Sequence, residues 1–312
     1  MRIVFFGAPE SALPSLEGLL RADHSIELVI TQPDRPSGRG KHLVPCPVKR
    51  FASQKEIPVF QPEKIRHDAL ALETINSARP DINVVVAYGQ ILPRSIIDLP
   101  PRHSVNVHFS LLPKYRGASP VQWAIFNGEQ RTGVTIFLLN EKMDEGDILA
   151  QEEMDIRPRE KAFELESRLA EGGAALLVQT LREIDRMTPV PQNHALATYA
   201  PKLRKKDGQV DWTKPAELIG RQVRAFSPWP SAFTFAGTTR IKIVEGETLP
   251  LPEKRGGGQP GTVIAVRKEG LEVGCGGGTV FLIARLQHEG KKEMEAYAFS
   301  LGSKTKIGDV LR

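Results

Sequence analysis

Residues 81–108, DINVVVAYGQILPRSIIDLPPRHSVNVH, contain two of the runs that decide the fold. The first run lies at Asp81–Ala87 and the second at Ser104–His108, and both contain β-branched residues. Such residues favour strands, and a continuous apolar run such as INVVV is typical of a parallel strand that helices cover on both faces. The stretch therefore predicts two strands of a wound sheet.

Similar runs on either side extend this pattern into an alternation of strands and helices. The expected further strands are Arg2–Phe6, Glu27–Thr31 and Gly133–Leu139, and the expected helices are Ala12–Ala22, Val48–Glu56, Lys64–Ala78, Pro120–Asn127 and Lys161–Met187. Strands that alternate with helices form mainly parallel sheets, because each crossover helix returns the chain to the same edge. We therefore expect an α/β fold with a Rossmann-like, doubly wound and mainly parallel sheet.

The amino-acid composition changes after Thr188, which indicates a second domain. The segment that follows is polar, basic and proline-bearing, so we expect a first domain at residues 1–188, a linker at 189–208 and a second domain at 209–312. The second domain contains a predicted helix at Ala216–Ala225 and short strands at Ala232–Phe235, Arg240–Val244, Thr262–Val266, Leu271–Val273 and Thr279–Leu286. Short strands separated by glycine-rich turns predict a small β-barrel, and we expect the OB type.

Charge is distributed unevenly along the 312 residues. The net charge is +5, but residues 201–312 carry nineteen Lys and Arg against twelve Asp and Glu, or +7, which leaves −2 for the first 200 residues. A basic half is typical of contact with a polyanion, although many basic domains bind none.

Cysteine content and hydropathy narrow the class of protein. Only Cys46 and Cys275 are present, so neither a disulfide framework nor a cysteine zinc site is expected. No apolar run approaches the roughly 18 residues of a membrane span. We expect a cytoplasmic protein that does not contact the membrane, and a monomer.

Three polar residues lie where doubly wound sheets bind their ligands, at the carboxyl ends of strands. Asn106 and His108 are two residues apart on one predicted strand, so their side chains project from the same face. Asp144 lies in the loop after the next predicted strand, close enough in this topology to approach the same crevice. The sequence therefore predicts an amide, an imidazole and a carboxylate at one site.

These side chains suit acyl transfer to an external amine. No cysteine is near, and Ser110 leads directly into the turn LLPKYRG, so a covalent enzyme intermediate has little support. Asn106 and an imidazolium at His108 can stabilise an oxyanion by hydrogen bonds. Asp144 favours the charged imidazole and can accept the proton that the amine releases, directly or through water. This chemistry requires no metal ion.

The run Asn106–Gly117, in which Asn, x, His, x precedes SLLPKYRG, resembles the folate-dependent formyltransferases, as does MDEGD further along. The similarity extends to FFGAPE, TQPDRPSGRGKHLVPCPVK, VVVAYGQILP and AFSPWPSAF and so spans nearly the whole chain. The resemblance implies that Asn106, His108 and Asp144 are catalytic and that the folate-binding turn consists of Ser110, Leu111, Leu112 and Pro113. Phe109 stands where some relatives have a smaller residue, so we expect it to change the shape of the pocket but not the three polar residues.

The full-length pattern, with its basic second domain, is similar to the branch of this family that acts on tRNA rather than to the shorter enzyme of purine synthesis. It implies 10-formyltetrahydrofolate as formyl donor and initiator methionyl-tRNA as acceptor, for translation initiation. Two basic segments are candidates for tRNA contact: the insert 32–50, with Arg35, Arg39, Lys41 and Lys49, and the linker, with Lys202, Arg204, Lys205 and Lys206. Closely spaced cations suit a phosphate backbone, and solvated loops are the alternative.

Two other functions compete with this interpretation. The same three residues would serve a formyltransferase that acts on an amino sugar, or a hydrolase that releases formate. A tRNA-binding protein without catalytic activity would explain the basic half but not the three polar residues. Trp212, Trp229 and Phe233 can stack on bases, yet isolated aromatic residues in a small barrel more often belong to its core.

Overall fold

The computed structural model describes residues 1–37, 42–250, 258–303 and 305–312. They form two compact units. Unit 1 consists of Met1–Pro120, Arg131–Asp155 and Leu165–Pro201, and unit 2 consists of Val121–Gln130, Ile156–Glu164 and Lys202–Arg312. Each unit has its own sheet, and two short segments that precede most of α6 in the sequence, residues 121–130 and 156–164, belong to unit 2.

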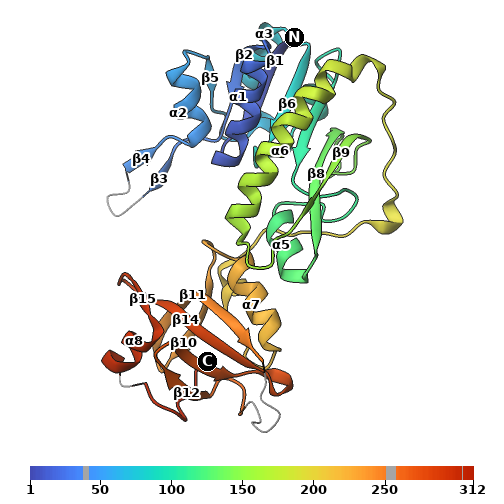
Figure 1. Cartoon of the computed structure of the whole chain (residues 1–312). Coiled ribbons are helices and arrows are strands. Elements are labelled where there is room, and N and C mark those ends of the chain that lie inside the picture. Colours follow the sequence, from blue (N-terminus) through green and yellow to red (C-terminus); the bar gives the residue numbers. More distant parts are fainter. Residues whose placement is uncertain (38–41, 251–257, 304) are drawn as a thin grey trace. The chain divides into compact units, whose positions relative to one another are not determined.

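The sheet of unit 1 has seven strands in the order β5-β2-β1-β6-β7-β8-β9 (Figure 1). They are β1 (Arg2–Gly7), β2 (Ser25–Ile30), β5 (Val59–Phe60), β6 (Ile82–Val86), β7 (Ser104–His108), β8 (Arg131–Leu138) and β9 (Ile148–Asp155). All pairs from β5 through β7 are parallel. The predicted α/β class with a mainly parallel sheet is confirmed.

The last two strands run in alternating directions. β7 and β8 are antiparallel with Asn106 opposite Phe137, and β8 and β9 are antiparallel with Thr135 opposite Gln151. The parallel direction expected for residues 133–139 is therefore wrong, because a buried apolar strand has the same composition in either direction. β9 was not expected, since its sequence ILAQEEMD is largely polar and lies at the edge of the sheet.

Helices cover both faces of this sheet, and Figure 1 shows α1 and α6 next to each other on one of them. The helices that pack on unit 1 are α1 (Leu13–Arg21), α2 (Pro47–Gln54), α3 (Ala69–Ala78), α4 (Arg94–Ile97) and most of α6 (Ala162–Glu183). On one face, Val4 and Phe6 of β1 share a buried cluster with Ile75 of α3 and Ile96 of α4. On the other face, a Cβ added to Gly18 of α1 would lie 3.6 Å from Ala174 of α6. The sheet is therefore buried on both sides, as its apolar strands require.

A short two-stranded ribbon projects from unit 1. It consists of β3 (Arg35–Ser37) and β4 (His42–Val44), which pair antiparallel with Arg35 opposite Val44. The ribbon follows β2 and precedes α2, so it lies within the basic insert of residues 32–50.

Unit 2 is built on a six-stranded antiparallel sheet with the order β10-β11-β14-β13-β12, in which β15 also pairs with β14. Its strands are β10 (Ala232–Ala236), β11 (Thr239–Leu249), β12 (Val263–Arg267), β13 (Gly270–Gly274), β14 (Val280–His288) and β15 (Glu293–Glu295), and its helices are α5 (Pro120–Asn127), α7 (Ala216–Ala225) and α8 (Ala296–Ser303). The chain end joins the two outer strands, because Arg312 pairs with Phe235 while Asp309 accepts a hydrogen bond from Val263.

The aromatic residues of unit 2 divide between core and surface. Trp212 and Phe233 are buried, and Trp212 Nε1 donates to Thr234 Oγ1 at 2.9 Å, so the interpretation as core residues is confirmed for both. Trp229 is 51% exposed. Among the helices that the structure describes, none combines the length and the apolar composition that a membrane span requires.

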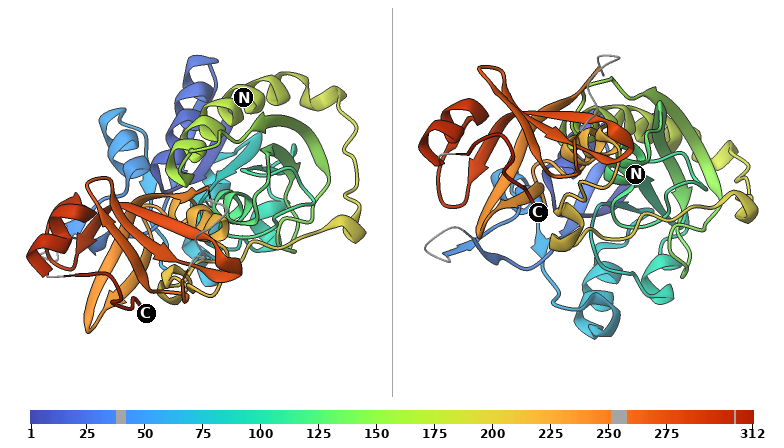
Figure 2. Two further views of the ribbon diagram at one scale, coloured as in Figure 1. Left: turned by 60° about the horizontal axis from the view of Figure 1, so that its bottom comes forward. Right: turned by 90° about the horizontal axis from the view of Figure 1, so that it is seen from below.

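The segment after α6 packs on unit 1 rather than running free. Val190 and Ile148 exchange backbone hydrogen bonds of 2.8 Å, and Arg116 pairs with Thr198 and Ala200 through the main chain. Part of the predicted linker, residues 189–201, thus packs against β9 and against the turn that follows His108. Figure 2 shows this segment, in yellow, extending from the end of α6.

Candidate active site

Strand β7 presents Asn106 and His108 on one face, because side chains alternate along a strand. β7 lies between β6 and β8, so the backbone of both residues is fixed by sheet hydrogen bonds. Asn106 is half-buried, and its side-chain amide has no hydrogen-bond partner among the described residues. An unpaired amide at this position is available to a ligand.

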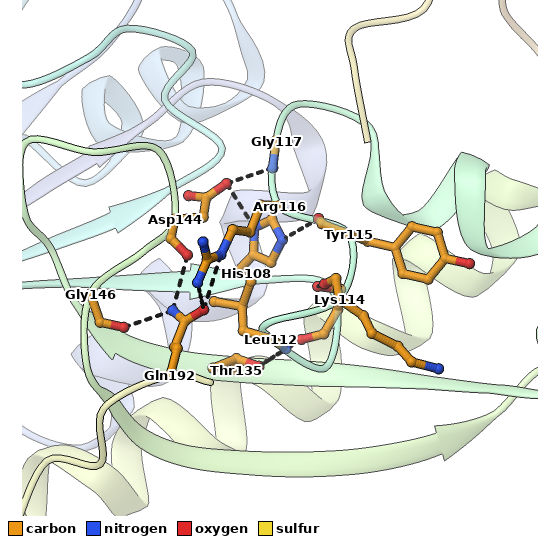
Figure 3. Close-up of polar contacts among 11 residues, drawn as sticks. His108, Leu112, Lys114, Tyr115, Arg116, Gly117, Thr135, Asp144, Gly146 and Gln192 are labelled. Atoms are coloured by element: carbon orange, nitrogen blue, oxygen red, sulfur yellow. Dashed lines mark hydrogen bonds and ion pairs between the residues drawn. The ribbon is translucent and has the colours of Figure 1, made fainter. Parts of the chain in front are cut away.

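The ring of His108 is buried, with 6% of the residue exposed, and each of its nitrogens faces an oxygen of the protein (Figure 3). Nε2 lies 3.0 Å from the carbonyl oxygen of Tyr115. Because a carbonyl oxygen can only accept, Nε2 carries a hydrogen, and Nδ1 is the nitrogen that gains or loses the second proton. Nδ1 lies 3.9 Å from Asp144 Oδ2, so a proton on Nδ1 gives an ion pair with that carboxylate.

Asp144 is brought to His108 by a loop between β8 and β9. Its Oδ2 accepts a hydrogen bond of 2.7 Å from the backbone N–H of Gly117. The side chain is 16% exposed, and its backbone has φ of 53°, a left-handed conformation that Asp tolerates better than most residues. The structure therefore brings Asp144 and His108 together, with the carboxylate still accessible to a substrate or a water.

The turn at Ser110–Pro113 is held by polar side chains of β8 and β9. Thr135 Oγ1 donates to the Ser110 carbonyl at 2.6 Å and accepts from Leu112 N–H at 3.1 Å. Gln151 Nε2 donates to the Leu112 carbonyl and to Thr135 Oγ1, both at 2.9 Å. Ser110 and Leu112 are buried, whereas Leu111 and Pro113 are partly exposed. The predicted folate turn is thus a rigid loop directly after His108.

Several residues that support this site were not singled out from the sequence. Arg116 is 1% exposed, and its guanidinium donates to Gln192 Oε1 from Nε at 3.1 Å and from Nη2 at 2.6 Å. Gln192 in turn donates to the carbonyl oxygens of Asp144 and Gly146 (Figure 3). Arg116 lies within the turn KYRG and Gln192 within the polar segment after α6, so no apolar period marks either residue.

The predicted tRNA-contacting residues of the insert have different surroundings. Arg35 is exposed and lies 3.7 Å from Glu63, whereas Lys49 Nζ pairs with Asp34 Oδ2 at 2.7 Å. Hydrogen bonds from Gln61 and Lys49 hold the pKa of Asp34 below its usual value. Arg39 and Lys41 lie outside the residues that the structure describes. Lys49 is therefore already engaged by a neighbouring carboxylate.

The basic residues of the other segment are exposed. Lys202, Arg204, Lys205 and Lys206 are all at the surface of unit 2, and Lys205–Gly208 form one turn of 3-10 helix. Arg204 N–H donates to Asp207 Oδ2 at 2.7 Å, which fixes the start of this turn. Within the described parts of the chain, no group of three His, Cys, Asp or Glu side chains is arranged to hold a metal ion.

Comparison with known proteins gives the same class of chemistry. Residues 1–181 match the formyl transferase family, and residues 202–304 match the family of formyl transferase C-terminal domains. A methionyl-tRNA formyltransferase of Synechococcus sp. (strain JA-3-3Ab) is 46% identical over 316 residues, which cover 99% of this chain and 97% of that protein. A protein of the same name from Moorella thermoacetica is 45% identical over 313 residues, covering 100% and 99%.

Solved structures share the fold at lower identity. HypX from Aquifex aeolicus, in complex with tetrahydrofolic acid, superposes with a TM-score of 0.64 and 19% identity over 99% of this chain and 48% of that longer chain. WlaRD, a sugar 3N-formyl transferase solved in the presence of dTDP and 5-N-formyl-THF, gives a TM-score of 0.65 and 17% identity over 94% and 99%. Both similarities concern the fold alone.

Proposed function

This chain belongs to the formyl transferase family, and on that premise we propose that it transfers the formyl group of 10-formyltetrahydrofolate to the amino group of methionyl-tRNA. The observation that carries this proposal is the arrangement around β7. The imidazole of His108 faces the Asp144 carboxylate at 3.9 Å, on the strand that also presents the unpaired amide of Asn106. Relatives that align with the whole chain are named for formylation of methionyl-tRNA.

The residues present fit a folate-type formyl donor. The amide of Asn106 is half-buried and has no hydrogen-bond partner among the described residues. The oxygen of a formyl group would be an acceptor for its NH₂ group. We assign the binding of the donor to the turn at Ser110–Pro113, because it is held rigidly by Thr135 and Gln151 immediately after His108. The bound folate supplies a formyl carbon that is open to attack by an amine.

Each of the three polar side chains has a defined role in this transfer. Asn106 donates a hydrogen bond to the formyl oxygen, which gains negative charge when the methionyl nitrogen bonds to the formyl carbon. His108, protonated at Nδ1, stabilises that charge, since at 3.9 Å its Nδ1–H makes no direct hydrogen bond with Asp144 and remains available to the oxygen. No side chain bonds covalently to the formyl group.

Asp144 completes the proton balance. It accepts, directly or through one water, the proton that the methionyl nitrogen loses on becoming an amide nitrogen. The same proton is then available to the folate nitrogen from which the formyl group departs. The hydrogen bond from Gly117 N–H orients one carboxylate oxygen, which leaves the other for this transfer.

We assign recognition of initiator methionyl-tRNA to the two basic segments. In the insert these are Arg35, Arg39, Lys41 and Lys49, and in the segment at the start of the second domain they are Lys202, Arg204, Lys205 and Lys206. Exposed cations neutralise phosphates and position a nucleic acid without reading its bases. This function places the protein in translation initiation as a cytoplasmic monomer.

The function is tested by replacing Asp144 with Asn. We expect Asp144→Asn to reduce kcat on the order of 10²–10⁴-fold, because an amide cannot accept the amine proton, with little change in tRNA affinity. Asp147→Asn is the matched control, since it removes a carboxylate from the same loop that is not part of the proposed site. Formylation rates and tRNA binding are measured separately, and undiminished turnover by Asp144→Asn contradicts the proposed chemistry.

The substrate is tested with three acceptors supplied with the same donor. Purified protein and 10-formyltetrahydrofolate are incubated with methionyl-tRNA, with an amino sugar nucleotide or with water alone. We expect rapid formylation of methionyl-tRNA only. Formylation of the sugar, or release of formate without formylated tRNA, would replace the proposed function by one of its competitors.

A further inference from the structure

The carboxylate of Asp144 is held in place by a loop that has little structure of its own. Residues 139–147 connect β8 to β9 without a helix, and Asp144 has a left-handed backbone with φ of 53°. One backbone hydrogen bond, from Leu138 N–H to the Asp147 carbonyl at 2.9 Å, ties the two ends of the loop. The remaining support for Asp144 therefore comes from outside the loop.

Gly117 N–H binds the Asp144 carboxylate, and the loop backbone is supported by the side-chain amide of Gln192. Its Nε2 donates to the carbonyl oxygen of Asp144 at 2.9 Å and to that of Gly146 at 2.7 Å. Both hydrogens of one amide group thus bind the loop, on the two sides of Glu145. Position 146 requires glycine, because an added Cβ there would lie 1.7 Å from the Leu138 carbonyl oxygen.

Arg116 determines which way this amide points. Gln192 Oε1 receives hydrogen bonds from Arg116 Nε and Nη2 at 3.1 and 2.6 Å. A guanidinium can only donate, so the oxygen of Gln192 must face Arg116 and the NH₂ group must face the loop. Gln192 is 5% exposed, which prevents water from replacing either set of bonds.

Arg116 is itself fixed by a carboxylate of the same loop and by a histidine of the segment that carries Gln192. Its buried guanidinium lies 3.4 Å from Glu145 Oε1 and 3.0 Å from His194 Nδ1. A buried cation without such partners is strongly unfavourable, so the position of Arg116 depends on the loop just as the loop depends on Gln192. The result is a network in which Gln192 binds the carbonyls of Asp144 and Gly146, as Figure 3 shows, and Arg116 faces the carboxylate of Glu145 between them.

We propose that Gln192, oriented by Arg116, is a positioning residue for the formyl-transfer reaction: it sets the place of the Asp144 carboxylate relative to His108. The inference rests on the proposed function, in which Asp144 accepts the amine proton. Gln192 does not touch the substrate. It acts through the backbone of the loop, and its role is therefore to preserve the distance of 3.9 Å between His108 Nδ1 and Asp144 Oδ2.

The test replaces Gln192 with Glu. This change keeps the size of the side chain and the oxygen that Arg116 binds, but it replaces two donated hydrogens by a carboxylate oxygen that faces two carbonyl oxygens. We expect kcat to fall by about 10- to 100-fold, since misplacing a reacting group by about 1 Å has an effect of that order. The KM values for methionyl-tRNA and for the formyl donor should change little, and the pH profile of kcat should shift.

A matched control exists in unit 2. Gln222 is also buried, and its Nε2 donates to two backbone carbonyls, those of Asp207 and Gln209, at 2.9 and 3.1 Å. Gln222→Glu therefore disrupts the same type of bridge at a position outside the proposed reaction site. It should lower the unfolding temperature as Gln192→Glu does, yet leave kcat and its pH profile unchanged.

A second variant covers the case in which Gln192→Glu does not fold. In Arg116→Met/Gln192→Met, two apolar side chains of similar length replace both buried polar groups, a change that proteins often tolerate. We expect the same selective loss of kcat, because the Asp144 and Gly146 carbonyls again lose their donor. In an Asp144→Asn background, Gln192→Glu should have no further effect on the residual rate.

These outcomes separate the inference from the proposed function. If Asp144→Asn retains full turnover, the proposed function is wrong. If Asp144→Asn is inactive while the Gln192 variants keep the wild-type kcat and pH profile, the function stands and Gln192 is not a positioning residue. Additive losses in the double variant Asp144→Asn/Gln192→Glu would likewise contradict action through Asp144.

Discussion

The three residues proposed to act on the substrate differ in how far the protein holds them. His108 is hydrogen-bonded at Nε2 and Asp144 at Oδ2, whereas the amide of Asn106 has no partner among the described residues. A polar group that is half-buried without a protein partner has lost part of its hydration. A hydrogen bond from such a group to a ligand oxygen therefore contributes more to the free energy of binding. Asn106 is therefore the residue whose contribution should appear in the reaction and not in stability.

We predict that Asn106→Ala lowers kcat on the order of 10²–10³-fold, the usual effect of removing one oxyanion donor. The unfolding temperature should stay near that of the wild type, because no hydrogen bond within the described residues is removed. Steady-state formylation of methionyl-tRNA and thermal unfolding are the two measurements. A large loss of stability, or an unchanged kcat, would show that Asn106 has another role.

At the scale of elements, the ribbon β3–β4 is anchored to the sheet at its base. Asp34, the residue before β3, accepts hydrogen bonds from Lys49 of α2 at 2.7 Å and from Gln61, just after β5, at 2.9 Å. Gln61 also donates to the Gln32 carbonyl at 2.7 Å. One carboxylate thus joins the start of the ribbon to a helix and to a neighbouring strand. Lys49 is therefore paired with a carboxylate at 2.7 Å, whereas Arg35 is more exposed and lies 3.7 Å from Glu63.

This anchor predicts a pH-dependent stability. The pKa of Asp34 is lowered in the folded protein, chiefly by the hydrogen bond from Gln61 and then by that from Lys49. The ionised carboxylate therefore stabilises the fold above the pKa of about 3.9 of an unfolded Asp, and this contribution is lost as the pH falls through the lowered folded value. We expect the free energy of unfolding of Asp34→Asn to be lower than that of the wild type at neutral pH. This difference in free energy should become smaller at acidic pH.

Urea unfolding at a series of pH values measures this difference. Asp23→Asn is a suitable control, because Asp23 is an exposed residue with φ of 59°, a conformation that Asn also adopts. A stability difference for Asp34→Asn that is the same at pH 7 and in acid would contradict the assigned role of the carboxylate.

At the scale of the whole molecule, positive charge is concentrated in the second part of the sequence. Residues 201–312 have a net charge of +7, whereas the chain as a whole has +5. Lys205 and Lys206 lie at the start of this part, on an exposed turn of 3-10 helix. Such cations act by displacing counterions from phosphates, which makes their contribution to tRNA affinity sensitive to salt.

We predict that Lys205→Ala/Lys206→Ala weakens tRNA binding and reduces the slope of log affinity against log salt by about one for each phosphate that the variant no longer neutralises. The value of kcat at saturating tRNA should be unchanged. Lys291→Ala/Lys292→Ala removes the same charge from another exposed turn of unit 2 and should affect the slope less. Equal effects of the two double variants would assign the binding to overall charge rather than to this turn.

Much of the architecture follows from local patterns. The bounds expected for β7, α5 and α7 agree with the structure. The strand and the amphipathic helix α7 each leave a period in the sequence, and α5 is an apolar run between a proline and a glycine. The partnership of Asn106 and His108 on one strand face follows from the same alternation. The family resemblance, carried by Asn106–Gly117 and by motifs along the chain, determined the class of chemistry.

Only the tertiary structure decided what holds the site together. The direction of β8, the packing of residues 189–201 on unit 1 and the contact of Arg116 with Gln192, 76 residues apart in sequence, have no local signal. Periodicity reports whether a side chain is buried, but not which distant group it meets. A buried arginine needs acceptors and a buried carbonyl needs a donor, and the folded chain satisfies both with one glutamine from a segment that, by sequence alone, looks like a linker.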